Sequence, residues 1–337
     1  MRVVVYSESG PSSVLSLVER PEPQPGPGEV RVRLHRAGVN PTDWKMRTGA
    51  TSPGDFPEVA PGQDGAGVVE AVGEEVDALS VGQRVWVFCA QHGRPYGTAA
   101  EQLVLPASRA VPLPDDASFD LGASLGVPAM TAHRALTSGE TPSRLGPGSL
   151  AGQVVLVAGG AGAVGNAAIQ LAVWSGAIVV TTVSSPEKAA LATAAGAQHV
   201  VDYRTEDVAA RVREVAADGV DLVVEVAPAD NLALDLDLVR NRATIAFYAN
   251  NGGAEATLPL RPTFGKNVRL QGVLLYLLSE EMLQAGALDV TAAVEAGALR
   301  VGEEAGVPLH HFPLAETAAA HDAVEAGAVG KVLLDLA

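Results

Sequence analysis

Three glycines at a fixed spacing, Gly160, Gly162 and Gly165, form the first pattern in this sequence that points to a chemistry. They follow a β-branched run, Val154–Ala158, and open a stretch with helical apolar periodicity. Such a turn lets the backbone approach a pyrophosphate, whose charge meets free N–H groups and the positive end of a helix. Glycines also serve helix-on-strand packing alone, but the strand–turn–helix context favours dinucleotide binding.

The tip of the next predicted strand, Ile178–Val183, indicates which dinucleotide is bound. NAD-binding folds place an acidic residue there, which accepts hydrogen bonds from the ribose 2′-hydroxyl. In this chain Ser184 and Ser185 stand at the tip, Lys188 follows, and Tyr203 comes just after the third strand. Hydroxyls and an ammonium hold a 2′-phosphate that a carboxylate would repel. The pattern predicts NADPH rather than NADH. The alternative explanation is that Ser185 only caps the following helix and that Lys188 is a solvated surface charge.

The composition is that of a globular protein, with 337 residues, 47% of them hydrophobic and 18% charged, which suffices for two domains. No apolar run approaches the roughly 20 residues that cross a bilayer. The N-terminus looks like a first strand rather than a signal peptide, so we expect a cytoplasmic location and no membrane partner. The net charge of −16 argues against nucleic acid as a partner. The single cysteine, Cys89, excludes an internal disulfide and a cysteine-rich zinc cluster.

The order of predicted elements divides the chain into a β-rich part and an alternating βα part. Strands punctuated by glycine and proline are expected at Val3–Tyr6, Leu15–Glu19, Glu29–Ala37, Gly67–Val72 and Arg84–Phe88, and Gly38–Arg47 leads into a long loop. After a helical signal at Leu121–Leu136, strands are expected at Val154–Ala158, Ile178–Val183, His199–Asp202, Leu222–Val226 and Thr244–Tyr248. Helices should begin near Gly162, Pro186, Thr205 and Asp230. This alternation predicts an α/β fold with a doubly wound parallel sheet.

The last part of the chain adds one more expected strand, Val268–Leu275, and helices at Glu280–Glu295 and Ala315–Glu325. A closing strand is expected at Lys331–Leu336. The strand Arg269–Leu275 ends the βα series and should form an apolar sheet edge, which invites pairing with another chain. Masking of this edge by a loop is the alternative.

Several short segments together carry a resemblance to a known family: Gly38–Pro41, Pro61–Gly67, Thr131–Leu136, Ala158–Gly165, Val183–Lys188, Asp202-Tyr203 and Gly330–Leu333. On these segments the chain resembles the medium-chain dehydrogenase/reductase superfamily over nearly its whole length. The resemblance is closest to the zinc-independent quinone oxidoreductase branch, which includes zeta-crystallin. It implies a GroES-like substrate domain of residues 1–122 and 275–337, in which the chain ends fold together, and a Rossmann domain of residues 123–274. Relatives pair the sheet edge across a two-fold axis, so the resemblance also implies a homodimer.

The resemblance implies a coenzyme site that extends beyond the glycine turn. Its residues would be Gly159, Gly160, Gly162, Ala163, Val164, Gly165, Ser184, Ser185, Lys188, Tyr203, Asn250 and Lys331.

Zinc-containing relatives place a cysteine where this chain has Asn40 and a histidine where it has Gln63. Both replacements bind zinc poorly. The adjacent His310 and His311 fall on an expected strand, where successive side chains point to opposite faces. We therefore expect a metal-free protein.

The resemblance also places Asn40 and Thr131 beside the nicotinamide. From its sequence context, Asn40 is equally a turn residue, and the hydroxyl of Thr131 is as often bonded to a helix carbonyl. Several relatives carry a tyrosine in the segment that contains Lys45, which is a candidate to donate a proton or orient a carbonyl. His92 and Tyr96 are further candidates for the rim of the cleft.

These residues predict a metal-free, NADPH-dependent reductase of quinones or activated α,β-unsaturated carbonyls. A reduced quinone oxygen takes its proton from water, whereas an enoyl carbon needs a positioned acid, and no obvious acid is present. An enoyl-thioester reductase is the alternative within the enzymes. A structural or RNA-binding protein that keeps the nucleotide domain is the alternative outside them, and the acidic charge disfavours RNA.

Overall fold

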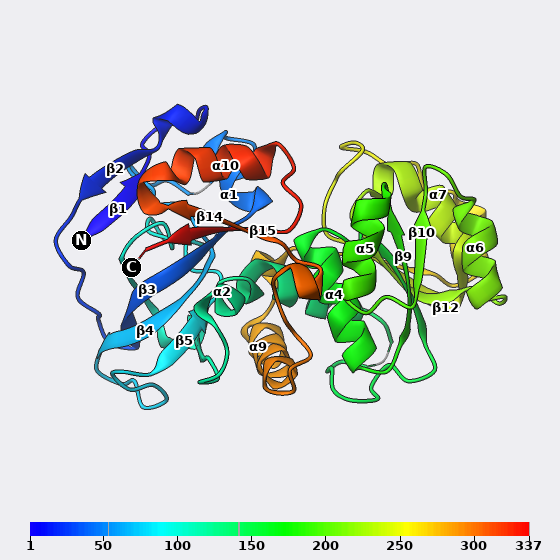
Figure 1. Ribbon diagram of the computed structural model, residues 1–337, viewed down its shortest axis with the longest axis horizontal. Coiled ribbons are helices and arrows are strands. Elements are labelled where there is room, and N and C mark those ends of the chain that lie inside the picture. Colours follow the sequence, from blue (N-terminus) through cyan, green and yellow to red (C-terminus); the bar gives the residue numbers. More distant parts are fainter. Residues whose placement is uncertain (53, 141, 337) are drawn as a thin grey trace. The chain divides into compact units, whose positions relative to one another are not determined.

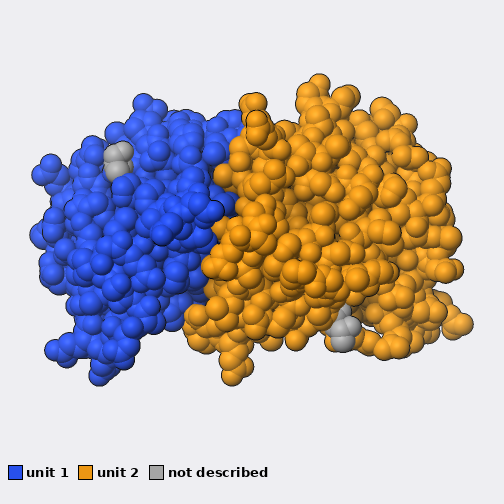
Figure 2. Space-filling model, turned by 60° about the horizontal axis from the view of Figure 1, so that its bottom comes forward, with its two compact units in different colours: residues 1–127, 308–337 blue, residues 128–307 orange. Residues whose placement is uncertain are grey.

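The computed structural model describes residues 1–52, 54–140 and 142–336, and the chain forms two compact units. Unit 1 comprises residues 1–127 and 308–337, and unit 2 residues 128–307 (Figure 2). The expected return of the chain end to the first domain is seen for residues 308–337. Residues 275–307, expected with that domain, cluster with unit 2 instead. A buried carboxylate on α9 (Glu280–Glu295) explains this: Asp289 accepts hydrogen bonds from Arg144 and the Leu145 N–H and lies 2.8 Å from His133 Nε2.

Unit 1 is built on a mixed sheet whose strands run in the order β14-β15-β3-β4-β5-β7, with β6 also paired to β3 (Figure 1). Its longest strand, β3, alternates buried and exposed side chains, so Val30, Val32 and Leu34 enter the core. β15 pairs antiparallel with β3 and so joins the last residues to the first part of the chain. The strands are β3 (Glu29–Val39), β4 (Asp64–Val72), β5 (Arg84–Val87), β6 (Gln102–Pro106), β7 (Ala110–Pro112), β14 (Leu309–Pro313) and β15 (Lys331–Asp335). A separate antiparallel pair consists of β1 (Arg2–Val5) and β2 (Ser16–Glu19).

Three α-helices of unit 1 are α1 (Pro41–Arg47), α2 (Phe119–Gly122) and α10 (Thr317–Glu325). The helix α1 lies where the sequence suggested the lead into a loop. Proline occupies its first position, and the Asp43 carboxylate accepts a hydrogen bond from the Asn40 N–H, which together start the helix. This short helix fixes the side chains that follow the end of β3.

Unit 2 contains a six-stranded parallel sheet in the order β10-β9-β8-β11-β12-β13, which confirms the predicted doubly wound fold. The strands are β8 (Val154–Ala158), β9 (Ile178–Val183), β10 (His199–Asp202), β11 (Val220–Glu225), β12 (Val239–Phe247) and β13 (Arg269–Gly272). The helices besides α9 are α3 (Met130–Leu136), α4 (Ala163–Trp174), α5 (Pro186–Ala194), α6 (Val208–Val215), α7 (Pro228–Leu238) and α8 (Leu260–Gly265).

Two local expectations for unit 2 need correction. The helix expected to begin near Thr205 begins at Val208, because the Asp207 side chain caps it by accepting from the Ala210 N–H. The expected strand Val268–Leu275 is shorter, since only Arg269–Gly272 pairs with β12. By contrast, α5 begins at Pro186 with Ser185 as its cap, as predicted. Within the described ranges, no helix is long and apolar enough to cross a membrane.

Candidate coenzyme site and candidate active site

In unit 2 the glycine turn connects the end of β8 to the start of α4, as the sequence predicts. Gly159 adopts a left-handed conformation with φ of 69°, which favours glycine. At Gly160 a Cβ atom would lie 2.1 Å from Thr181 Oγ1, and at Gly165 it would lie 2.4 Å from the Gly159 carbonyl oxygen. The fold itself therefore requires glycine at these three positions.

Gly162 differs from the other glycines of the turn. A Cβ built there would meet only the Gly159 carbonyl oxygen at 3.4 Å, an ordinary van der Waals contact. Protein packing therefore does not explain this glycine, whereas close approach of a ligand to the backbone does. Gly162 directly precedes α4, whose first-turn N–H groups, including those of Ala163, Val164 and Gly165, have no partners within the helix. An anion at this turn would meet those donors and the positive end of the helix dipole.

The predicted phosphate-binding residues gather where β9 ends and α5 begins. The Ser185 hydroxyl accepts a hydrogen bond from the Lys188 N–H at 3.3 Å, and Lys188 Nζ donates to Ser184 Oγ at 3.0 Å. The cap reading of Ser185 is thus correct, and the ammonium of Lys188 lies at the strand tip rather than away from it. The Ser185 hydroxyl also lowers the pKa of Glu187, which places one carboxylate beside this group. The arrangement offers donors for a phosphate with one nearby opposing charge.

Tyr203 and Asn250 lie after two further strands of the same parallel sheet. Tyr203 follows β10, donates its N–H to the Val183 carbonyl at 3.1 Å, and has 53% of its side chain exposed. Asn250 is exposed and follows β12. Because the carboxyl ends of parallel strands share one edge, both lie at the edge that carries the glycine turn.

In unit 1 four buried side chains form a hydrogen-bonded group, here called the Asn40 quartet: Asn40, Asp43, Asp64 and Lys331. Asn40 Nδ2 donates to Asp64 Oδ1 at 2.7 Å, and Lys331 Nζ donates to Asn40 Oδ1 at 2.7 Å and to Asp64 Oδ2 at 3.1 Å. Asp43 Oδ2 accepts from the Asn40 N–H at 2.7 Å. All four residues are at most 3% exposed. They bring together the end of β3 and the starts of α1, β4 and β15.

Two glycines provide the space that the quartet occupies. A Cβ at Gly38 would lie 2.4 Å from Asp64 Oδ1 and 2.6 Å from Lys331 Nζ. A Cβ at Gly126 would lie 2.3 Å from the Cβ of Asp64. The next residue, Val127, donates its N–H to Asp64 Oδ2 at 3.0 Å. The Asp64 carboxylate thus accepts three hydrogen bonds and is held by backbone as well as by side chains.

The two carboxylates of the quartet lie in different electrostatic surroundings. Asp64 is next to the Lys331 ammonium, whereas Asp43 is fully enclosed, and its Oδ1 atom has no hydrogen-bond partner. Burial, followed by repulsion from Asp64, raises the pKa of Asp43 to about 7. Asp43 is therefore a buried acid that changes its protonation state near neutral pH.

The structure places the predicted catalytic candidates in different surroundings. Asn40 belongs to the quartet and directly precedes α1, which fits its suggested role as a turn residue, and its place beside the nicotinamide stays a prediction. Lys45 lies on α1, half-buried, with Nζ 5.8 Å from the ring centre of Trp44. Thr131 is 7% exposed on α3 of unit 2. Lys331, expected at the coenzyme, uses two of its three N–H donors on Asn40 and Asp64, and its contact with coenzyme stays a prediction.

Neither rim candidate belongs to the quartet. His92 is exposed, and partial burial and nearby Arg109 lower its pKa. Tyr96 is 43% exposed and borders a small, mainly apolar pocket with Met1 and Pro21.

Gln63, which the resemblance aligned with a zinc-binding histidine, is completely buried. Its Nε2 donates to Gln91 Oε1 at 2.8 Å, and its Oε1 accepts from the Gln91 N–H at 3.2 Å. Both ends of the amide are therefore used within the protein. In the part of the chain that the structure describes, no three His, Cys, Asp or Glu side chains gather to hold a metal.

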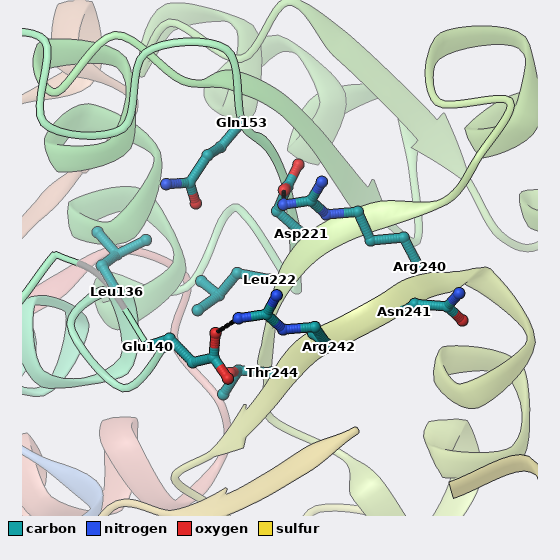
Figure 3. Close-up of a pocket in the computed structure, with 10 residues that line it drawn as sticks. Leu136, Glu140, Gln153, Asp221, Leu222, Arg240, Asn241, Arg242 and Thr244 are labelled. Atoms are coloured by element: carbon teal, nitrogen blue, oxygen red, sulfur yellow. Dashed lines mark hydrogen bonds and ion pairs between the residues drawn. The ribbon is translucent and has the colours of Figure 1, made fainter. Parts of the chain in front are cut away.

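A polar pocket of about 300 Å³ in unit 2 lies at the other edge of the parallel sheet (Figure 3). Gln153 immediately precedes β8, Asp221 is near the start of β11, and Arg240 and Arg242 are near the start of β12. Asp221 pairs with Arg240, and Glu140 with Arg242. Since ligands of such sheets bind at the carboxyl ends of the strands, this pocket is not the coenzyme site.

Sequence reasoning missed Asp43, Asp64 and Gln91 as parts of the site. Asp64 stood inside a recognised motif, Pro61–Gly67, and its acidic character between glycines was the available signal. Asp43 follows Asn40 by three residues, the spacing of a helix cap, which was a second signal. Nothing in the sequence pairs Gln91 with Gln63, because that contact forms only when the sheet folds.

Comparison with known proteins agrees with these two units. Residues 26–115 match the family model described as alcohol dehydrogenase GroES-like domain, and residues 163–292 match zinc-binding dehydrogenase. Human quinone oxidoreductase is 31% identical over 342 residues, covering 99% of this chain and 97% of its own. The 2-haloacrylate reductase of a Burkholderia species is 31% identical, covering 95% and 94%. A mycobacterial protein solved in complex with NADPH is 33% identical, with a TM-score of 0.82 and 99% of each chain covered. The chain therefore belongs to the quinone oxidoreductase family of the medium-chain dehydrogenase/reductase superfamily.

Proposed function

We propose that this enzyme transfers a hydride from NADPH to quinones or to activated α,β-unsaturated carbonyls without a metal ion. The observation that carries the coenzyme half is Gly162, whose missing side chain leaves room that the protein does not use. The Ser184–Lys188 hydrogen bond places an ammonium at the strand tip, where NAD-specific folds carry a carboxylate. The NADPH complex of the mycobacterial relative supports the same choice.

The coenzyme would be held by the residues that the sequence assigned to it. The glycine turn and the start of α4, residues 159–165, would receive the pyrophosphate. Ser184, Ser185 and Lys188 would bind the 2′-phosphate, with Tyr203 beside the adenosine ribose. Asn250 and Lys331 would complete the site. NADPH supplies the hydride when bound, and the protein's part is to orient it and exclude water.

Asn40, Thr131 and Lys45 are the residues that we assign to the reacting end of the coenzyme. An amide and a hydroxyl can hold the nicotinamide carboxamide or the carbonyl oxygen of the acceptor. A quinone takes its proton from water after hydride transfer, so it needs little more. The similarity to a 2-haloacrylate reductase supports an activated alkene as the second acceptor class, for which Lys45 is the candidate proton donor.

A panel of acceptors with purified enzyme tests this proposal. NADPH oxidation should be followed with a benzoquinone, an unsubstituted enone and an enoyl thioester, with NADH as the parallel coenzyme. The assignment is supported if the enzyme reduces the quinone or the enone with NADPH and does so much more slowly with NADH at the same concentration. Turnover only with the enoyl thioester favours a biosynthetic reductase, and no turnover with any acceptor contradicts the proposed substrate class.

We also propose a homodimer formed through the edge strand β13. Exposed apolar side chains lie after this strand and on the preceding helix α8: Phe264 is 60% exposed, Leu274 53% and Leu277 76%. An open strand edge beside exposed apolar side chains favours pairing with a second copy. Light scattering at micromolar concentration should give twice the chain mass, and Leu277→Asp should shift it toward the monomer. A monomeric wild type would contradict the proposal.

A further inference from the structure

The orientation of the Asn40 amide is fixed by two partners of opposite chemistry. An ammonium has only donors and therefore requires the amide oxygen, whereas an ionised carboxylate has only acceptors and requires the amide NH2 group. Lys331 Nζ lies 2.7 Å from Oδ1, and Asp64 Oδ1 lies 2.7 Å from Nδ2. Rotating the amide by 180° would place its NH2 group against the Lys331 ammonium and its oxygen against the Asp64 carboxylate, so neither hydrogen bond could form.

The partners are themselves held in place. Asp64 accepts three hydrogen bonds, one of them from the Val127 N–H, and it is completely buried. Lys331 is 2% exposed and bonded to both Asn40 and Asp64, so the three side chains form a closed triangle. A Cβ at Gly38 or at Gly126 would collide with Asp64, so this side chain packs directly against both glycines. The Asn40 amide is consequently held with Oδ1 toward Lys331 and Nδ2 toward Asp64, and it also hydrogen-bonds the Asp43 carboxyl.

We propose that Asp64 and Lys331 are positioning residues that keep the Asn40 amide in this one orientation for hydride transfer. The inference rests on the proposed function, in which Asn40 lies beside the nicotinamide or the acceptor carbonyl. A fixed donor needs no reorganisation during hydride transfer, and this is how preorganised polar groups raise a rate. Lys331 would then act through Asn40, beside any direct contact of its third N–H with the coenzyme.

A neutral double variant, Asp64→Asn with Lys331→Met, separates positioning from charge burial. Removing both charges avoids an unpaired buried ion, so the variant should fold with a melting temperature near that of the wild type. The Val127 N–H holds the oxygen of the amide introduced at position 64, which turns its NH2 group toward Asn40, and the thioether introduced at position 331 has no N–H to donate. The Asn40 amide therefore loses its fixed orientation. We expect the single-turnover rate of hydride transfer to fall about tenfold. Because the rate is measured at saturating NADPH, loss of a Lys331 contact with the coenzyme does not enter this readout.

The decisive comparison repeats the neutral pair in an Asn40→Ala background. If the pair acts through Asn40, it should change the hydride-transfer rate less than about twofold once the amide is gone. Deuterium at the transferred position of NADPH should slow every variant, which shows that the hydride step is being measured.

A second neutral pair, Arg47→Met with Glu325→Gln, is the matched control. It removes another ion pair of unit 1, formed by the buried Arg47 and the exposed Glu325 with 2.6 Å between Nη2 and Oε2, and should leave the rate unchanged. An equal loss from the Asp64/Lys331 pair in both backgrounds, or no loss in either, would overturn the positioning role. A wild-type rate for Asn40→Ala alone would instead remove Asn40 from the proposed active site, and the positioning role with it.

Discussion

The two candidate regions of this enzyme handle their polar groups in opposite ways. In the Asn40 quartet of unit 1, four side chains from segments far apart in the sequence bond one another and are at most 3% exposed. At the coenzyme edge of unit 2, the groups come from short continuous segments and are partly open, with Tyr203 53% exposed. Gly162 there leaves space that no described residue fills.

The difference separates polar groups that bond mainly to other protein groups from polar groups that stay available to a ligand. Buried charges must be paired, so the quartet is costly to disturb and holds its members in one arrangement. Apart from the three glycines that the fold requires, we expect groups at the candidate coenzyme edge to contribute little to folding, so that changing them affects mainly binding. The predictions below test this contrast, beginning with the largest effect.

Lys331→Met should lower the free energy of unfolding by about 3–5 kcal/mol, because it leaves the Asp64 carboxylate buried without its cation. Urea denaturation measures the loss. Lys45→Met, which changes a half-buried lysine of the same unit, should cost less than about 1 kcal/mol. Adding Asp64→Asn to Lys331→Met should recover most of the stability, and a failure to recover would argue against the charge explanation.

Asp43→Asn should change stability in a way that depends on pH. The folded-state pKa of Asp43 is raised from 3.8 to about 7, so folding keeps it protonated while the unfolded chain ionises it. The stabilising contribution of Asp43 to the free energy of unfolding is therefore full below about pH 4, declines as the pH rises to 7, and stays reduced above that. The free energy of unfolding of the variant, relative to that of the wild type, should therefore increase by about 2–4 kcal/mol between pH 4 and pH 8. Asp116→Asn, an exposed change in unit 1, should show a flat difference, and a flat difference for Asp43→Asn would refute the assignment.

Lys188→Ala should weaken NADPH binding by about 1.5–3 kcal/mol, the range for a hydrogen bond to a charged group, and should barely affect NADH. Titration of coenzyme fluorescence measures both affinities. Thermal stability should be unchanged, because Lys188 bonds only Ser184 through its ammonium. Equal losses for the two coenzymes, or a wild type that prefers NADH, would contradict the 2′-phosphate site.

Glu187→Gln should strengthen NADPH binding by a small factor, about two- to fivefold, with no change for NADH. Its carboxylate lies by the Ser185 hydroxyl, exposed and close to where the 2′-phosphate would bind, and like charges in water repel weakly. The effect should shrink as salt is added. An unchanged affinity at low salt would mean that the phosphate binds farther from this carboxylate.

Metal removal should have no effect. Asn40 and Gln63 carry amides where the resemblance places a zinc-binding thiolate and imidazole in zinc-containing relatives, and amides bind zinc poorly. Both ends of each amide are also hydrogen-bonded to protein groups. Elemental analysis should find no stoichiometric zinc, and dialysis against a chelator should preserve turnover. One tightly bound zinc per chain would overturn the expectation.

The sequence determined the parts of this protein that are local. Alternating strands and helices, the glycine turn and the serine cap of α5 each depend on neighbouring residues, so periodicity and spacing predicted the parallel sheet, the turn before α4 and the start of α5. Local signals misplaced the ends of elements that depend on another contact. The helix expected near Thr205 begins only after the capping residue Asp207, and β13 ends where its pairing with β12 ends.

Only the tertiary structure decided the chemistry around Asn40. Asn40, Asp64 and Lys331 are separated by 24 and 267 residues, and no spacing rule connects them. Their contact follows from the pairing of β15 with β3 and of β3 with β4, which brings the three strand ends together. Burial then makes a pair of opposite charges necessary, fixes the amide between them, and raises the pKa of Asp43, because a charge that is harmless in water must be compensated inside the protein.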